Sequence, residues 1–218
     1  MDAEFWLQRW HEGQIGFHRG EVMPLLEQYW PTLDVAAGGR VFVPLAGKTL
    51  DMHWLAAQGL QVLGCELAPL AVDAFFAEAG IEPETGRDAD GVHHRAGAID
   101  LVQGDVFALT AGTLATMDAV YDRAALIALP PAMRRRYVDE VYGRLPQGCR
   151  GLLITLEYPQ AEKAGPPFPV PEDEVQALFS PRWDIERLVR RDILAGEPRF
   201  IAEGVTALST AVYRLTRR

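Results

Sequence analysis

The stretch from Gly39 to Glu66 constrains the fold of this chain most, because it reads as strand, tight turn, helix and second strand. Its first apolar run, Val41 to Val43, stops at Pro44, which is typical of a short buried strand that ends in a turn. An amphipathic pattern follows from Thr49, which can cap a helix, to Gln58. A second apolar run covers Leu60 to Gly64. The stretch therefore predicts one βαβ unit.

An acidic residue, Glu66, lies where the second of these strands would reach its carboxyl end. It follows Gly47 at close to the ~20-residue offset of a ribose-binding acid in open α/β sheets. The turn has one glycine and lacks the spaced glycines that hold a pyrophosphate, which argues against NAD. A nucleoside without phosphates, of which S-adenosylmethionine is the common example, needs the carboxylate alone. A second interpretation, in which Glu66 only caps the next helix, stays open from spacing alone.

Composition limits the class of protein. The chain has 218 residues, a net charge of -9, 49% hydrophobic and 23% charged residues, which suits one soluble globular domain and disfavours nucleic-acid binding. No apolar stretch approaches the roughly 20 residues that cross a bilayer, and the acidic, aromatic start lacks an export signal, so a cytoplasmic protein is expected. Cys65 and Cys149 form no metal or redox pattern and are expected to be reduced core residues.

The rest of the chain alternates helices with strands, which predicts a three-layer α/β fold with a mostly parallel sheet and helices on both faces. The last strand is suited to an antiparallel edge. Ile81 to Gly97 is polar and glycine-rich and is expected to form a long surface loop carrying His93 and His94, without a metal site. The arginines Arg134 to Arg136 are expected on the solvated face of a helix. The expected helices cover 4–12, 25–30, 69–80, 130–145 and 172–179, and the expected further strands cover 99–102, 119–121, 151–157, 183–189 and 205–215.

Four segments in order resemble the bacterial thiopurine S-methyltransferases. They are FWLQRWHEGQIGFH at the start, VFVPLAGKTLDMHWLAAQG with the GCE that follows it, VYDRAALIALPPAMRRRY in the middle, and GEPRF near the end. Each segment alone is a weak signal, but together they are specific and run over nearly the whole chain. The resemblance implies a Rossmann-like, seven-stranded methyltransferase sheet. It also implies a single methyltransferase domain over 1–218, with residues 1–30 as an N-terminal helical cover over the cofactor site.

The same resemblance implies a set of cofactor contacts. It places S-adenosyl-L-methionine over Leu45 and Gly47, which replace the glycine-rich loop of most methyltransferases. Glu66 would hold the ribose hydroxyls, and Asp105 and Val106 would border the adenine. The product would be S-adenosyl-L-homocysteine, and no metal is implied.

Further residues are assigned to the acceptor side by the resemblance. Trp10 would lie against the cofactor, and Arg123 would lie beside both the methionine end of the cofactor and the acceptor. Arg199 would supply a second positive charge, and Phe17 would close over an aromatic acceptor. Two simpler interpretations stay open: Arg123 could form a surface ion pair with Asp122, and Phe17 could only anchor its loop.

The implied activity is methyl transfer to thiopurines and other aromatic or heterocyclic thiols, in which the arginines favour the ionised acceptor. Methylation of inorganic selenium or tellurium species, as in metalloid detoxification and tellurite resistance, or of small thiols is an alternative that the sequence cannot separate. Two alternatives of other classes are an NAD-dependent oxidoreductase and a non-catalytic nucleoside-binding module. The expected partner is a small-molecule thiol or metalloid, with no nucleic acid and no membrane, and the expected state is a monomer.

Overall fold

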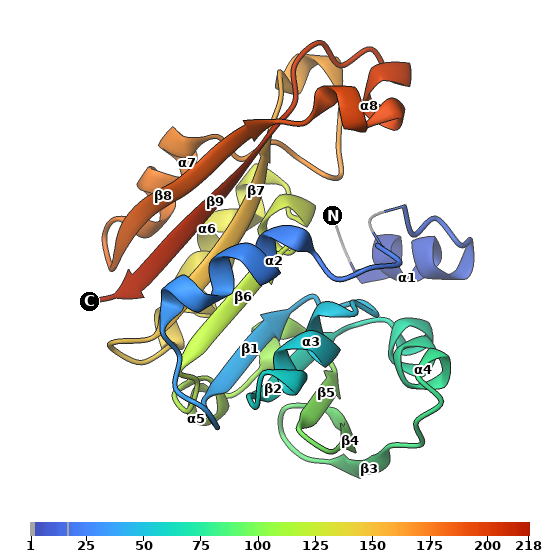
Figure 1. Ribbon diagram of the computed structural model, residues 1–218. Helices are drawn as coiled ribbons and strands as arrows, with labels where there is room; N and C mark the ends of the chain where they lie inside the picture. The colour runs from blue at the N-terminus through green and yellow to red at the C-terminus, as the bar shows by residue number, and fades with distance from the viewer. Residues whose placement is uncertain (1–2, 17) are drawn as a thin grey trace.

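The computed structural model describes residues 3–16 and 18–218, which form a nine-stranded sheet with the order β3-β4-β5-β2-β1-β6-β7-β9-β8 (Figure 1). The middle of the sheet is parallel, because β1 pairs in parallel with β2 and β6, β2 with β5, and β6 with β7. The mostly parallel α/β sheet predicted from the sequence is therefore confirmed. Its strands are β1 (Arg40–Pro44), β2 (Gln61–Glu66), β3 (Glu84–Arg87), β4 (Val92–Ala96), β5 (Ile99–Gln103), β6 (Ala119–Arg123), β7 (Arg150–Glu157), β8 (Trp183–Asp192) and β9 (Ser209–Arg217).

The expected surface loop over Ile81 to Gly97 is wrong, because this segment contains the antiparallel hairpin β3–β4. Strand β4 pairs with β5, which extends the sheet from the expected seven strands to nine. The hairpin is stabilised by buried polar contacts that hydrophobic alternation does not reveal. His93 is 4% exposed, and its Nδ1 and Nε2 lie 2.9 Å and 2.8 Å from carboxylate oxygens of Asp100 and Asp88.

The last strand is antiparallel as predicted, but its expected place at the edge of the sheet is wrong. Strand β9 lies between β7 and β8 and pairs antiparallel with both. Its residues Thr210 to Tyr213 are all buried, and because successive side chains point to opposite faces of the sheet, both faces are covered there. Strand β8 forms the edge, and its many charged, exposed side chains suit a position where one side meets water.

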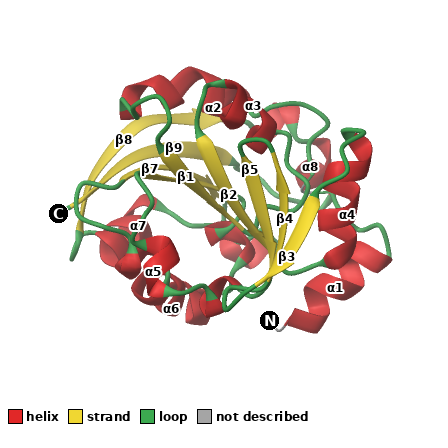
Figure 2. Ribbon diagram, turned by 90° about the horizontal axis from the view of Figure 1, so that it is seen from below, coloured by secondary structure: helices red, strands yellow, loops and turns green. Residues whose placement is uncertain are grey.

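Helices cover both faces of the sheet (Figure 2). Helices α2 and α3 lie on one face and α5, α6 and α7 on the other, and α4 contributes to the same buried cluster as α2 and α3. Within the described residues no helix is both long and apolar enough to span a membrane. The helices are α1 (Ala3–His11), α2 (Pro24–Tyr29), α3 (Asp51–Ala57), α4 (Pro69–Glu78), α5 (Ala111–Leu114), α6 (Pro131–Glu140), α7 (Glu172–Phe179) and α8 (Pro198–Ala202).

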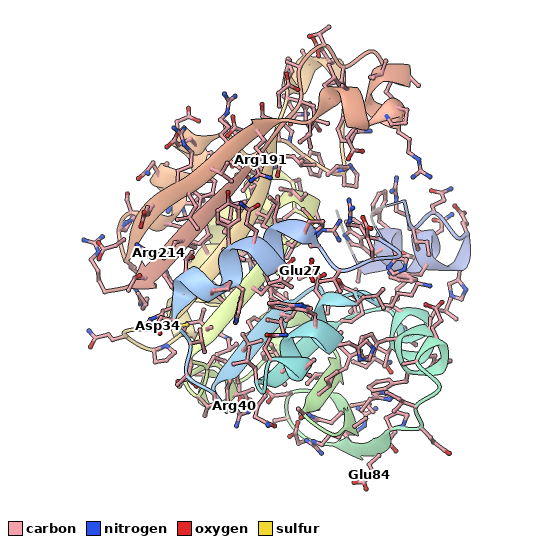
Figure 3. The ribbon with its side chains drawn as sticks, viewed as in Figure 1. Glu27, Asp34, Arg40, Glu84, Arg191 and Arg214 are labelled. Carbon is pink, nitrogen blue, oxygen red and sulfur yellow. The ribbon has the colours of Figure 1, made fainter. Side chains whose placement is uncertain are left out.

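Polar side chains fasten α2 to the sheet on the face that it covers. Arg191 of β8 donates to Gln28 Oε1 and to the Tyr29 hydroxyl at 2.9 and 3.1 Å, and Arg214 of β9 donates to the Thr32 carbonyl at 3.2 Å (Figure 3). Long, exposed arginine side chains make these contacts. They join α2 and the turn that follows it to strands β8 and β9.

The buried carboxylate of Asp51 anchors the start of α2 to the core. It accepts the Met23 N–H and the Tyr121 hydroxyl, both at 2.8 Å. Because Asp51 lies in the first turn of α3 and Tyr121 lies on β6, this contact joins three segments beneath one end of the sheet. The N-terminal segment is thereby held close to the carboxyl ends of the parallel strands.

The expectation that all three consecutive arginines face solvent is wrong for Arg134, whose side chain is 1% exposed. Its Nε donates to the Leu129 carbonyl at 3.0 Å, and its Nη1 lies 2.6 and 2.7 Å from the two carboxylate oxygens of Glu174 on α7. The pair links α6 to α7. Arg136 does face solvent, where it pairs with Glu140 one turn along α6.

Replacing Glu174 with alanine should therefore destabilise the fold, because it leaves a buried guanidinium without its carboxylate. We expect the free energy of unfolding to fall by about 2 kcal/mol, less than the roughly 3–5 kcal/mol typical of such a loss, because the Glu174 side chain is 28% exposed. Urea denaturation measures this change. Glu140→Ala, which breaks the exposed pair with Arg136, is the control and should change stability little. Equal effects of the two substitutions would contradict the structural role of the Arg134–Glu174 pair.

Candidate active site

The carboxyl ends of the five parallel strands meet at one edge of the sheet and form the floor of a large cavity. Its volume is about 1120 Å³. Every predicted site residue within the described part of the chain lines this cavity, whereas Phe17 lies outside the described residues. The structure thus brings together Trp10, Leu45, Gly47, Glu66, Asp105, Val106, Arg123 and Arg199.

Glu66, the last residue of β2, is fixed by two backbone amides at the bottom of this cavity. Its side-chain oxygens accept the N–H groups of Gly47 and Ala68, each at 2.8 Å. Burial raises the pKa of the Glu66 carboxyl, and the N–H groups of Ala68 and Gly47 oppose that rise. The capping interpretation is correct in part, because Ala68 directly precedes α4. An ionised carboxylate has about four acceptor positions, however, so the backbone N–H groups do not use all of its capacity.

The turn after β1 adopts an unusual backbone conformation. Leu45 has a φ of 47° and Gly47 a φ of 54°, and the left-handed region is uncommon for a residue such as leucine. Such backbone conformations occur preferentially where a ligand or a catalytic group must be held. The indole of Trp10 covers this turn, because a Cβ atom built on Gly47 would lie 3.4 Å from Cζ2 of Trp10. Through Trp10, helix α1 therefore packs against this turn at the cavity.

Asp105 and Val106 follow β5 and take different positions. Val106 is 6% exposed and belongs to the core on the α6 side of the sheet. Asp105 is exposed and accepts the Phe107 N–H at 2.9 Å, which stabilises the short helical turn after β5. Together they present one apolar and one acidic group to the cavity.

Arg123 ends β6, and its neighbour Ala124 turns the chain with a φ of 74°. The interpretation of an ion pair between Arg123 and Asp122 is wrong. Asp122 is fully buried, and its carboxylate accepts the Tyr137 and Tyr142 hydroxyls at 2.9 Å and the Leu126 N–H at 3.0 Å. Burial raises the pKa of this carboxyl, and the three donors oppose the rise.

Several lysine and arginine side chains line the cavity, and half of them already have acidic partners, while Arg9 lies over the Phe5 ring and Arg191 donates to Gln28 and Tyr29. The ion pairs are Arg19–Glu21, Lys48–Glu78, Arg136–Glu140 and Lys163–Glu203. By contrast, no ion pair, side-chain hydrogen bond or aromatic contact of Arg123 or Arg199 occurs among the residues that the structure describes. In a chain with a net charge of -9, two such guanidinium groups at one cavity favour an anionic ligand.

Other cavity residues were not predicted from the sequence. His18 lines the cavity beside the N-terminal segment, and burial, followed by the positive charge of Lys48, lowers its pKa. Ile127, Leu129 and Met133 provide an apolar wall next to Arg123. The segments that resemble the methyltransferase family contain all four residues, but the apolar character of Ile127, Leu129 and Met133 is the same as that of core positions.

One cluster of potential metal ligands lies in the β3–β4 hairpin, outside the residues that line the cavity. Single ligand atoms of Asp88, Asp90 and His93 all lie within 4.8 Å of one another. The sequence pattern did not reveal that His93 lies beside two carboxylates. These groups already bond within the protein, His93 to two aspartates and Asp90 to Thr110 and Thr113. The absence of a metal stays a prediction.

The fold is shared with known methyltransferases. The 1,6-didemethyltoxoflavin-N1-methyltransferase of Burkholderia thailandensis, solved with S-adenosylhomocysteine, superposes with a TM-score of 0.65 at 17% identity, over 99% of this chain and 86% of its own. A SAM-dependent methyltransferase from Anabaena variabilis gives a TM-score of 0.65 at 12% identity, over 99% of this chain and 95% of its own. At these identities the likeness shows the fold alone.

Sequence comparison identifies the family. The family described as Thiopurine S-methyltransferase (TPMT) matches residues 1–218. The thiopurine S-methyltransferase of Xanthomonas campestris pv. campestris (strain 8004) is 61% identical over 217 residues and covers 100% of both chains. That of Bordetella parapertussis is 59% identical over 217 residues, with 100% of this chain and 99% of its own covered. With this identity over its full length, a methyltransferase sheet and the cavity at its carboxyl edge, the chain belongs to the thiopurine S-methyltransferase family.

Proposed function

We propose that this chain transfers the methyl group of S-adenosyl-L-methionine to the sulfur of aromatic and heterocyclic thiols, thiopurines among them. Family membership gives the reaction class and the cofactor. The choice of acceptor rests on Arg123 and Arg199, which form no ion pair with any residue that the structure describes. The same cavity also contains an apolar wall. That combination suits an aromatic anion.

The floor of the cavity fits the cofactor in this proposal. Glu66 keeps acceptor capacity for the ribose hydroxyls, and Leu45 and Gly47 give the close backbone approach that a nucleoside needs. Asp105 and Val106 border the adenine. Bound S-adenosyl-L-methionine supplies a sulfonium methyl group that is already activated for transfer. The protein is therefore left with three tasks, which are to orient the acceptor, exclude water and favour the thiolate.

Arg123 and Arg199 perform the last of these tasks by charge. A thiol of ordinary acidity is only a few per cent ionised near neutral pH. A guanidinium group close to the sulfur stabilises the thiolate and lowers the pKa of the acceptor, which increases the reactive fraction. No nucleophilic side chain is needed, and burial raises the pKa of the Cys65 thiol, which keeps it protonated.

Residues 1–30 act in this proposal as a cover over the cofactor, within a single methyltransferase domain spanning 1–218. The supporting contacts are those of Trp10, which packs with Ala68 and Ala71 at the start of α4 and lies over Gly47. Phe17 belongs to the same segment and is proposed to contact the acceptor. Exclusion of water by such a cover strengthens the electrostatic effect of the two arginines.

Trp10→Ala should therefore weaken S-adenosylhomocysteine binding moderately. We expect about a tenfold higher Kd, because the indole provides apolar contact but no charge. Isothermal titration calorimetry measures the change. Trp6→Ala removes an indole from the same helix. The Trp6 side chain also lines the cavity, but it is less buried than that of Trp10, so the effect of its removal should be smaller. An unchanged Kd for Trp10→Ala would mean that Trp10 only packs against its neighbours in the protein and does not contact the cofactor.

The proposed function is tested by ligand binding and turnover together. Calorimetry should show binding of S-adenosylmethionine and S-adenosylhomocysteine but not of NAD, which separates a methyltransferase from an NAD-dependent oxidoreductase. Methylated product from aromatic thiols then separates an enzyme from a nucleoside-binding module. The same assay with selenite and tellurite tests the metalloid alternative, which stays a prediction. Cofactor binding without methylation of any thiol would overturn the proposed acceptor class.

The expected partners complete the proposal. A small-molecule thiol agrees with the relatives named above. A monomeric state, a cytoplasmic location and the absence of nucleic-acid binding stay predictions from the composition, and gel filtration and a salt-dependent nucleic-acid binding assay test the first and third.

A further inference from the structure

The N-terminal segment and helix α8 meet beside the cavity at one close contact. A Cβ atom built on Gly16 would overlap Nη1 of Arg199 and would lie 3.5 Å from its Cζ. The Arg199 guanidinium therefore occupies the space that a side chain at position 16 would need. The two residues are distant in sequence, and neither motif that contains them predicts the contact.

The contact lies where two hollows join. Gly13, Ile15, Gly16 and His18 on one side, and Glu197, Pro198 and Arg199 on the other, line a smaller hollow of about 390 Å³. Gly16, His18, Glu197 and Arg199 also line the large cavity. Gly16 and Arg199 therefore both lie on the border shared by the smaller hollow and the large cavity that contains the proposed acceptor site.

The backbone at Gly16 does not itself require glycine. Gly13 in the same segment has a left-handed φ of 66°, whereas Gly16 lies outside the left-handed region. An alanine at position 16 is thus compatible with its backbone conformation. What excludes a side chain there is the guanidinium of Arg199, and because that group ends a flexible side chain, the arginine would move and the backbone would not.

We propose that Gly16 is a positioning residue for Arg199. Its missing side chain leaves the space in which the guanidinium lies against the N-terminal segment, at the acceptor side of the cavity. This inference rests on the proposed function, because the charge of Arg199 matters to turnover only if the acceptor reacts as an anion. A methyl group at position 16 displaces that charge and so selects against weakly acidic thiols, which depend most on a nearby cation.

The test compares Gly16→Ala with Gly20→Ala. Gly20 belongs to the same segment, has no left-handed φ, and has no atom within 4 Å of a Cβ built on it. For the least acidic aromatic thiol of a graded series, Gly16→Ala should lower kcat/KM about tenfold or more, since small displacements of a catalytic group have effects of this size. The loss should shrink for more acidic thiols. Gly20→Ala should stay within roughly twofold of wild type throughout.

A double-mutant comparison shows whether the effect acts through Arg199. In the Arg199→Ala background, Gly16→Ala should cause no further loss of kcat/KM, because no guanidinium remains to be displaced. An equal loss in both backgrounds would overturn the inference. So would equal effects of Gly16→Ala and Gly20→Ala, or a loss accompanied by a fall in Tm and in S-adenosylhomocysteine affinity, because that result indicates a general structural change.

A readout without turnover separates this inference from the proposed function. The Nε–Hε NMR resonance of Arg199, assigned with Arg199→Lys, should shift in Gly16→Ala and stay in place in Gly20→Ala. If wild-type protein methylates no thiol, the proposed function fails, and the resonance alone then decides whether Gly16 positions Arg199. An unshifted resonance in Gly16→Ala would refute the contact.

Discussion

Glu66→Ala is expected to weaken S-adenosylhomocysteine binding by at least about 100-fold. Paired hydrogen bonds from two ribose hydroxyls to a carboxylate contribute roughly 1.5–3 kcal/mol each, and about 1.4 kcal/mol corresponds to a tenfold change in Kd. The substitution also leaves the Gly47 and Ala68 N–H groups without their acceptor. The turn after β1 would lose the contact that fixes it to β2. Isothermal titration calorimetry measures the loss, and urea denaturation shows whether the variant remains folded.

The charge of Glu66 can be separated from its shape by Glu66→Gln and by pH. Glutamine keeps one acceptor oxygen for one of the two backbone N–H groups but places its NH2 donor opposite the other, so binding should be intermediate. Burial raises the pKa of Glu66, and the ionised form is the one that accepts from ribose hydroxyls. Affinity of the wild type should therefore fall with decreasing pH, beginning above the range of an ordinary glutamate. Glu66→Gln should lack this dependence. Equal Kd values for wild type and Glu66→Ala would exclude the ribose assignment.

The part of the fold that was predicted correctly is the part governed by local apolar patterns. Val41 to Val43 and the run before Glu66 form buried parallel strands, as predicted, because continuous apolar runs bounded by turns have few other stable arrangements. The ends of parallel strands necessarily meet at one edge. The sequence alone could therefore place Glu66 and Arg123 at a common site, although their roles there came from the family resemblance.

The features that were missed depend on polar and charged partners that an apolar pattern does not reveal, some of them near and some far away in the sequence. Strand β4 looks polar because His93 is buried by carboxylates on a loop and on β5 rather than by apolar neighbours. Arg134 looks solvated because its partner, Glu174, belongs to a helix that begins much later. The contact between Gly16 and Arg199 is of the same kind. The apolar periodicity of a segment predicts the structure of that segment alone. It does not show which buried charged side chains form a pair.

Arg123→Ala is expected to cause the largest loss of turnover, about 100-fold or more in kcat/KM for a weakly acidic aromatic thiol, as removal of a preorganised charge often does. A guanidinium has a pKa above ~12 and stays protonated, so Arg123 acts by charge and not as a general base. Arg123→Lys should keep part of the activity, because lysine preserves the charge without the planar fork. Arg136→Ala is the comparison, since Arg136 lines the same cavity but pairs with Glu140, and its effect should be much smaller.

The acidity of the acceptor distinguishes stabilisation of a thiolate from simple positioning. Initial rates at saturating S-adenosylmethionine are to be measured for aromatic thiols of graded acidity with wild type, Arg123→Ala, Arg123→Lys and Arg199→Ala. A thiol that is already ionised at the assay pH needs little help from a cation. The loss of initial rate in both alanine variants, relative to wild type, should therefore become smaller as the acceptor becomes more acidic. Raising the pH toward the pKa of a weakly acidic thiol should make this loss smaller in the same way. The same loss of rate for every thiol and at every pH would mean that the arginines only orient the acceptor or the cofactor. No loss of rate in either alanine variant would exclude both residues from the acceptor site.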